Sequence, residues 1–299
     1  MDRVIEALSQ LTGQTVRRGE LVRTPGRRLR WIDVGEGPTV VLVAGSAETC
    51  LNWAPVLPRL TRRFRVVAYD RAGSGDSDRT DRLSISAEVD DLVALLDRVG
   101  SSIVVGHSWG GLLAQLAATR RPEAVRGLVL EDATHEDVLK RAPLWMKLAE
   151  RGMGIGVMAA YRLGLFGRLA ARSARHLAEH SSDDAGVREL LVRAYMDSYA
   201  TRSQVSMIRD EAALSDRGIA ELRRWRATHR LPDVPLIALS ATDKPAKLRE
   251  MCLGHAEDVC AELPRARHIV VDRAGHYIHR DRPDAVAAAV DRVARPADQ

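Results

Sequence analysis

The sequence is poor in cysteine and has no long apolar run. Its 299 residues include three cysteines, Cys50, Cys252 and Cys260, and these form neither a disulfide framework nor a cluster with metal-ligand spacing. No apolar run approaches the length of a membrane span, and the first residues lack the charged-then-apolar pattern of a secretory signal. We therefore expect a reduced, cytoplasmic protein that does not insert stably into a membrane.

Lysine is also scarce, so arginine supplies nearly all of the positive charge. The 45 basic residues include only four lysines, and 40 acidic residues leave a net charge of +5. The basic clusters are short and interleaved with acids, at 27–28, 62–65 and 223–226. This pattern favours solvated surfaces over a nucleic-acid-binding stripe. The length suits one large domain, or a core with an insertion.

One stretch, residues 101–111, organises the chain. A β-branched run from Ile103 to Val105 predicts a buried strand, and a helical pattern follows it. Between them, residues 106–110 (Gly-His-Ser-Trp-Gly) fit the G-x-S-x-G pattern of a nucleophile elbow. Such a turn strains its serine and requires small neighbours, which Gly106 and Gly110 provide. Ser108 would then lie at a helix N-terminus, where the helix dipole favours developing negative charge.

Strands and helices alternate on both sides of this stretch. A short amphipathic helix over 1–13 and a hairpin over 21–34 precede buried strands over 39–43, 64–69 and 125–130. Two further strands are expected over 236–239 and 267–271. Alternation of this kind predicts a mostly parallel sheet with flanking helices. From about 134 to 231 the pattern is helical only, which predicts a core in two parts, 1–133 and 232–299, with a helical cap over 134–231.

Two further side chains complete a candidate catalytic set. A serine hydroxyl is a weak nucleophile, so it needs a neighbouring base, and the base needs an orienting carboxylate. His276 follows the last expected strand, and Asp243 follows the strand before it. Because the carboxyl ends of parallel strands share one edge of the sheet, we expect Ser108, Asp243 and His276 to meet there. Asp132 also follows a strand and remains the alternative acid.

The chain resembles the α/β-hydrolase-fold family, in its capped, lipase/esterase-like form. The resemblance rests on residues 106–111, on residues 69–77 after the preceding strand, on Asp243, and on Gly275-His276 with Pro283 beyond. It covers nearly the whole core and is specific for the fold rather than for a substrate. It implies a mostly parallel central sheet, flanking helices and an inserted helical cap.

The resemblance also implies an oxyanion hole built from backbone N–H groups. The family commonly carries a His-Gly pair after its third strand, whereas this chain reads Ala44-Gly45-Ser46. The residue after the glycine normally donates its N–H, which would be Ser46 here, and the second donor would be Trp109. Because backbone donors tolerate a change of side chain, we expect the hole to persist without the histidine. For His107 the resemblance implies a structural role.

Together these residues predict a serine hydrolase that cleaves the carboxylic ester of a small or medium, lipophilic substrate through an acyl-enzyme. A thioesterase, a lactonase, a peptidase-like amidase and a carbon–carbon bond hydrolase on the same triad remain alternatives. A non-catalytic ligand-binding protein on this fold is the alternative of another class. No metal or cofactor is expected, since the G-x-G pattern at 73–75 lacks the third glycine of a dinucleotide loop.

The substrate preference rests on an apolar stretch within the predicted cap, residues 143–171. Methionine and leucine at helical spacing usually pack inward, so we expect a cap core and a pocket wall rather than a membrane-seeking surface. The candidate pocket residues are Trp145, Met146, Met153, Met158 and Ile278. We expect a small-molecule substrate and no nucleic-acid partner, and the sequence leaves the oligomeric state open.

Overall fold

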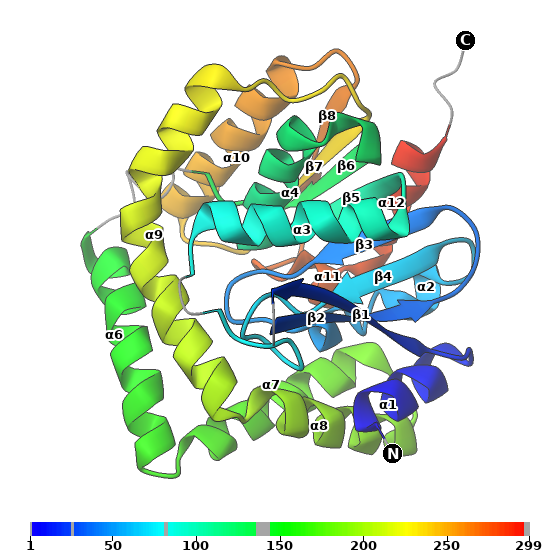
Figure 1. Ribbon diagram of the computed structural model, residues 1–299, viewed down its shortest axis with the longest axis vertical. Coiled ribbons are helices and arrows are strands. Elements are labelled where there is room, and N and C mark those ends of the chain that lie inside the picture. Colours follow the sequence, from blue (N-terminus) through cyan, green and yellow to red (C-terminus); the bar gives the residue numbers. More distant parts are fainter. Residues whose placement is uncertain (1, 25–26, 81–82, 136–143, 296–299) are drawn as a thin grey trace.

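The protein is built around one eight-stranded sheet, seen in the computed structural model of Figure 1. The structure describes residues 2–24, 27–80, 83–135 and 144–295, without the side chains of 24, 144–151, 153 and 215–220. The strand order is β1-β2-β4-β3-β5-β6-β7-β8. The strands are β1 (Arg17–Thr24), β2 (Arg27–Val34), β3 (Thr39–Val43), β4 (Arg65–Tyr69), β5 (Ser102–His107), β6 (Val125–Glu131), β7 (Leu236–Ala241) and β8 (Ala266–Val271).

The hairpin β1–β2 joins the sheet antiparallel to β4, and the remaining pairs are parallel. The mostly parallel sheet predicted from the sequence is thereby confirmed. Its central strands are buried on both faces, as continuous β-branched runs require. Along β3, Val40 and Leu42 enter one hydrophobic core, while Val41 and Val43 enter the other. The period of two along a strand thus divides the interior into two layers.

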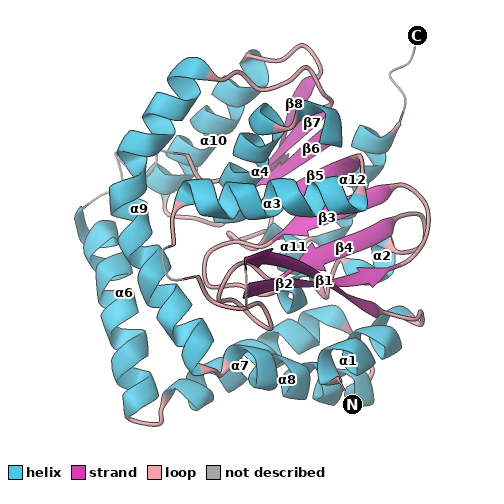
Figure 2. Ribbon diagram, in the orientation of Figure 1, coloured by secondary structure: helices cyan, strands magenta, loops and turns pink. Residues whose placement is uncertain are grey.

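Helices cover both faces of the sheet (Figure 2). Helices α3, α4 and α10 bury the core on one face, and α2 and α12 bury the core on the other. The helices outside the insertion are α1 (Arg3–Thr12), α2 (Leu57–Leu60), α3 (Ile85–Val99), α4 (Trp109–Arg120), α10 (Ala246–Ala261), α11 (Ile278–Asp281) and α12 (Pro283–Ala294), with 3₁₀ turns η1 (Cys50–Trp53) and η2 (Pro122–Ala124).

The described residues between β6 and β7 form four helices, within the segment predicted as a cap. They are α6 (Leu144–Arg162), α7 (Phe166–Ser181), α8 (Ala185–Tyr199) and α9 (Arg202–Thr228). In Figure 1 the long helix α9 runs along one side of the molecule with α6 beside it. Helix α1 packs on α8, through Val4, Ala7 and Leu8, so the N-terminal helix helps to hold the insertion against the core.

The inward packing expected for the apolar stretch of the insertion holds for one face only. Val157 and Met158 pack beside Phe166. Ile155 and Leu163, by contrast, are 73% and 72% exposed. The expectation was wrong for those side chains because α6 packs mainly against α9, which covers a single face of it. No helix of the described residues is both long and apolar enough to cross a membrane.

Backbone contacts around the end of β5 explain the glycines of the predicted elbow. A Cβ atom built on Gly110 would lie 2.1 Å from the carbonyl oxygen of Val43 in β3. A Cβ atom on Gly106 would lie 2.5 Å from the carbonyl oxygen of Gly110. The first turn of α4 therefore rests directly on the backbone of two strands, and no side chain fits between them.

This contact predicts that Gly110→Ala destabilises the protein strongly. The new methyl group must displace backbone rather than a flexible side chain, and we expect a loss of about 3 kcal/mol or more in the free energy of unfolding. Gly156→Ala in α6 is the matched control, since nothing lies within 4 Å of its Cβ position, and it should be neutral or stabilising by up to about 1 kcal/mol. Urea unfolding measures both, and equal stabilities of the two variants would contradict the argument.

Candidate active site

Ser108 lies at the junction of β5 and α4 in a strained conformation, with φ 50° and ψ −116°. Its backbone N–H donates to the carbonyl of Glu131 at 2.9 Å, and its carbonyl accepts from the N–H of Thr134 at 2.9 Å. Its hydroxyl oxygen is partly exposed and lies 3.3 Å from Oγ1 of Thr134. These bonds to β6 and the segment after it hold the serine at the rim of the sheet, as the elbow pattern predicts.

His276 pairs with Asp132. Its Nδ1 donates to Oδ2 of Asp132 at 3.1 Å. Asp132 directly follows β6, has φ 44°, and is 5% exposed. Its other oxygen, Oδ1, accepts from the N–H of Ala241 at the end of β7, at 3.1 Å. The carboxylate is therefore fixed from two neighbouring strands and can orient the imidazole of His276.

Asp243 does not reach His276. Its side chain is exposed, and its backbone N–H donates to the carbonyl of Ala274 at 2.9 Å. Within the described ranges its carboxylate makes no hydrogen bond or ion pair with the imidazole. Of the two acids considered from the sequence, the structure brings the alternative, Asp132, to the histidine. Strand β7 continues to Ala241, two residues past its predicted end, so Asp243 falls in the turn beyond the strand.

The side chain of Lys244, rather than that of Asp243, approaches Asp132. Its ammonium group forms an ion pair with Oδ2 of Asp132, the oxygen that also accepts from His276. The Lys244 side chain is 4% exposed. Although burial alone would raise it, the hydrogen bond from His276 and the charge of Lys244 hold the pKa of Asp132 below its usual value. The acid therefore stays ionised beside the histidine.

His276 carries the properties of a general base. Loss of hydration lowers the pKa of His276, and the charges of His107 and Lys244 lower it further, while Asp132 acts in the opposite direction. A pKa below the ordinary 6.5 leaves the imidazole mostly neutral at pH 7, although 44% of the side chain is exposed to solvent. Among the described side chains the Ser108 hydroxyl contacts Thr134 rather than His276. Such catalytic hydrogen bonds often tighten only when substrate is bound.

The two predicted oxyanion donors, Ser46 and Trp109, follow β3 and β5, which are neighbouring parallel strands. Ser46 is exposed in the loop after β3, and Trp109 is the first residue of α4, where a backbone N–H has no intrahelical partner. In the part of the chain that the structure describes, neither N–H donates to another backbone group. The loop is fixed next to Ser46, because the N–H of Gly45 donates to Oε2 of Glu48 at 2.6 Å.

A buried pair, Glu48 and His107, lies beneath the rim. The Nδ1 atom of His107 is 2.8 Å from Oε2 of Glu48, and its Nε2 atom is 2.9 Å from the carbonyl oxygen of His276. A carbonyl oxygen only accepts hydrogen bonds, so Nε2 of His107 carries a proton. The ionised carboxylate of Glu48 also only accepts, so Nδ1 carries a second proton. Burial opposes the charge, but Glu48 raises the pKa of His107 to about 9, and His107 lowers the pKa of Glu48 to about 2.

Glu48 and His107 also form part of a candidate metal site among the described residues. Glu48, His107 and His279 offer ligand atoms within 4.8 Å of one another. Two ligands of a tetrahedral zinc ion lie about 3.3 Å apart, whereas the Glu48–His107 separation of 2.8 Å is that of an N–H···O bond. The other ring nitrogen of His279, Nδ1, lies 2.7 Å from Oε1 of Glu131. The distances therefore fit side chains linked by protons better than a metal centre.

A cavity of about 220 Å³ opens beside the loop that carries Ser46. Ser46 and Ala47 border it from the core, and helices α7 and α8 of the insertion border it from the other side. Most of its side chains are polar or aromatic, and they include Asn52, His176, Tyr195, Tyr199 and Tyr277. This cavity is therefore more polar than the lipophilic pocket expected from the sequence.

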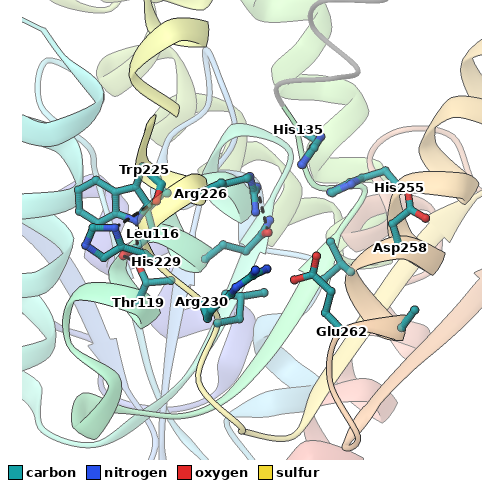
Figure 3. A pocket seen from close by; sticks show the side chains of 14 residues that line it. Leu116, Thr119, His135, Trp225, Arg226, His229, Arg230, His255, Asp258 and Glu262 are labelled. Carbon is teal, nitrogen blue, oxygen red and sulfur yellow. Dashed lines mark hydrogen bonds between the residues drawn. The ribbon is translucent and has the colours of Figure 1, made fainter. Parts of the chain in front are cut away.

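A second cavity, of about 370 Å³, lies between α4, the end of α9 and α10 (Figure 3). The rings of His135 and His255 face each other across 3.8 Å, measured between their centroids. Arg226 and Arg230 lie opposite Asp258 of α10 and Glu262, the residue after that helix. None of the predicted catalytic residues lines this cavity.

The two predicted pocket residues with described side chains, Met158 and Ile278, lie in different clusters. Ile278 is fully buried in the core beneath the sheet, and Met158 packs in the cluster around Phe166. The side chains of Trp145, Met146 and Met153 lie outside the described residues. Neither Ile278 nor Met158 lines the two cavities described above.

Sequence reasoning missed Glu48, Lys244 and Thr134. Lys244 had a usable signal, since it is one of four lysines and directly follows a predicted site residue. Glu48 stands two residues from the predicted donor Ser46, but its partner His107 is 59 positions away. No spacing rule joins residues that meet only when separate strands pack side by side.

Comparison with known proteins assigns the family. Residues 40–289 match the alpha/beta hydrolase family, so the chain belongs to it. Bifunctional epoxide hydrolase 2 of Sus scrofa is 34% identical over 116 residues, and polyketide synthase ThaQ of Burkholderia thailandensis is 28% identical over 277 residues. These alignments cover 37% and 91% of this chain, but only 21% and 12% of the relatives, so the chain spans a small part of each relative's length.

The likeness extends to solved structures. The Cif epoxide hydrolase from Acinetobacter nosocomialis superposes with a TM-score of 0.74 at 15% identity, over 94% of this chain and 89% of that one. At this identity the likeness concerns the fold alone. The sheet order and flanking helices described above are accordingly those of the alpha/beta hydrolase family.

The Glu48–His107 pair predicts a pH-dependent stability. The folded-state pKa of His107, about 9, lies above the ordinary value of 6.5. Its contribution is therefore fully present below pH 6.5 and is lost as the pH rises through about 9. Glu48→Gln removes the attracting charge, so the free energy of unfolding should fall less over this interval than in the wild type.

Urea unfolding at a series of pH values measures this difference. Glu189→Gln, at a largely exposed carboxylate paired with Arg193 on α8, is the control and should keep the wild-type slope. The same slope in Glu48→Gln as in the wild type would contradict a charged His107.

Proposed function

We propose that this chain is a serine hydrolase that cleaves a carboxylic ester through an acyl-enzyme. The observation that carries the proposal is the strained Ser108 on the same rim as the His276–Asp132 pair. A binding protein would not need a serine held in a high-energy conformation beside an oriented, neutral imidazole. The non-catalytic alternative on this fold is therefore disfavoured.

Each residue has a defined role in the proposed reaction. A change of side-chain rotamer brings the Ser108 hydroxyl to Nε2 of His276, which takes its proton as Oγ attacks the ester carbonyl. Asp132 accepts from Nδ1 and stabilises the imidazolium, and the N–H groups of Ser46 and Trp109 bind the oxyanion. His276 then protonates the leaving alcohol. A water molecule, deprotonated by His276, finally releases the acid from Ser108.

The nucleophile separates ester cleavage from epoxide hydrolysis. Several relatives are named epoxide hydrolases, but attack of a serine oxygen on an epoxide carbon would form an ether, which water cleaves very slowly. Attack on an ester, thioester, lactone or amide gives an acyl-serine ester that water does cleave. We therefore favour acyl transfer to water and keep thioesters, lactones, amides and carbon–carbon bonds next to a carbonyl as substrate alternatives on the same triad.

The cavity beside Ser46 supports a substrate with a polar or aromatic group. Tyrosine hydroxyls and an asparagine amide can bind a hydroxyl, carbonyl or ring nitrogen of the substrate. This extends the expectation of a lipophilic substrate, which rests on the helical segment around α6. We propose that a polar group of the substrate lies in the cavity beside Ser46 and that its apolar part extends toward α6.

Labelling with a fluorophosphonate probe tests the nucleophile. The wild-type protein should be labelled at one residue, and Ser108→Ala should abolish the label because the attacking oxygen is gone. Ser46→Ala is the matched control, because it changes a serine at the same rim and keeps the backbone N–H. Failure of the wild type to label, or labelling of Ser108→Ala at the wild-type rate, would refute the serine hydrolase.

A pair of asparagine variants tests the acid. Asp132→Asn should lower kcat for an active ester by about 10⁴-fold, because the imidazole loses its orienting charge and its tautomer. Asp243→Asn, at the exposed acid, should stay close to the wild-type rate. Steady-state kinetics with a p-nitrophenyl ester measure both variants. The reverse ranking would restore Asp243 as the acid.

A further inference from the structure

Helix α9 of the insertion contacts the loop that carries Ser46. The N–H of Ala47 donates to Oε2 of Glu211 at 2.8 Å, and the carbonyl of Ala47 accepts from Nε2 of Gln204 at 3.2 Å. Gln204 and Glu211 are seven residues apart on α9, two helical turns, so they lie on the same face. One peptide unit on each side of Ala47 is therefore fixed by the same helix.

These bonds hold Ala47 in an unfavourable conformation. Its φ of 62° lies in the left-handed region, which a residue with a Cβ atom rarely adopts. The conformation of Ala47 sets the direction of the chain immediately after the proposed oxyanion donor, Ser46. Without partners for its N–H and carbonyl, this segment would be free to relax to a commoner conformation.

A buried ion cluster links the other proposed donor to the same helix. Nη2 of Arg71 donates to the carbonyl of Gly45 at 2.7 Å and pairs with Oε1 of Glu211 at 2.5 Å. Nη1 of Arg71 pairs with Glu88, and Glu88 accepts from the indole N–H of Trp109 at 2.9 Å. The cluster of Arg71, Glu88 and Glu211 thus touches the residues before and after Ser46 and the side chain of Trp109.

We propose that Gln204 and Glu211 are positioning residues for the oxyanion hole, so that helix α9 of the insertion helps to assemble the catalytic site. The inference rests on the proposed function in that it assigns the N–H groups of Ser46 and Trp109 to the oxyanion. It adds that the placement of these two N–H groups depends on the position of α9. Movement of α9 away from the core would release both sides of Ala47 together.

The burial of Glu211 agrees with a role beyond packing. Burial raises the pKa of Glu211 to about 7, against the opposing charge of Arg71. Replacing a buried ion pair by apolar side chains of similar volume is often neutral or stabilising, so packing alone does not require a carboxylate here. Its two oxygens nevertheless bind both Ala47 and Arg71, the two groups that adjoin the loop. The cavity beside the loop is lined by Ala47 and by α7 and α8, so substrate contacts there would bear on the same loop.

Paired variants on α9 test this inference. Gln204→Ala and Glu211→Ala should lower kcat for a p-nitrophenyl ester by about tenfold to a hundredfold, since small displacements of catalytic groups reduce rates on that scale. KM should change little, and affinity for a trifluoromethyl ketone, which forms the tetrahedral adduct on Ser108, should fall in step with kcat. Glu211→Gln keeps an acceptor for Ala47 and should recover part of the loss.

The neighbouring residues provide matched controls. Ser203 donates its hydroxyl to the carbonyl of Gly73 at 3.1 Å, and Asp210 pairs with Arg79 at 3.1 Å, so both join α9 to the core without contacting the Ser46 loop. Ser203→Ala and Asp210→Ala should therefore keep wild-type kcat. Equal kcat losses in Gln204→Ala and Ser203→Ala, or losses that follow melting temperature across all variants, would overturn the inference.

Hydrogen exchange separates this inference from the proposed function. The peptide that contains Ala47 should exchange faster in Glu211→Ala than in Asp210→Ala, whether or not the enzyme turns over an ester. Unchanged exchange at Ala47 would overturn the positioning role even if Ser108 labels as expected. Faster exchange in a protein whose Ser108 does not label would support the contact and refute only the hydrolase.

Discussion

The close approach of α4 to the backbone of β3 is the constraint on which the rest of the site depends. At Gly110 the two segments leave no space for a Cβ atom. This contact forces the chain to turn sharply after β5, and the turn imposes a positive φ on Ser108. The same turn places the N-terminus of α4, with its free N–H groups, beside the serine. The positions of the proposed nucleophile and the proposed anion site thus follow from one packing contact.

Three sets of buried charges surround that turn, and each contains opposite charges. Lys244 compensates Asp132, His107 compensates Glu48, and Arg71 lies between Glu88 and Glu211. Isolated charges in such places would be expelled or neutralised. As pairs they fix loops that have little regular structure of their own. The proposed base, the loop that carries Ser46 and helix α9 are therefore joined to the core by ion pairs as well as by apolar contacts.

Membership of the alpha/beta hydrolase family accounts for the core but leaves the chemistry to individual side chains. Relatives named for epoxide hydrolysis share the fold, and the fold alone does not choose between opening an epoxide and cleaving an ester. In the reaction proposed for this chain, the serine oxygen at the elbow favours the ester. The insertion then adds its own contribution, because α9 contacts the loop that would bind the oxyanion.

The sequence by itself determined the mostly parallel sheet, the run of helices between β6 and β7, and the sharp turn at Ser108. It also gave the basis for proposing His276 as the base. Those features depend on local patterns: β-branched runs, helical periodicity, and glycines at a sharp turn. Only the tertiary structure decided that Asp132 rather than Asp243 reaches His276, that the apolar stretch of α6 leaves Ile155 exposed, and that Gln204 and Glu211 bind Ala47. Such contacts join residues far apart in the chain. Which side chains meet depends on where each strand ends and on which face of a helix points inward. Both can shift by one or two residues without altering the sequence pattern.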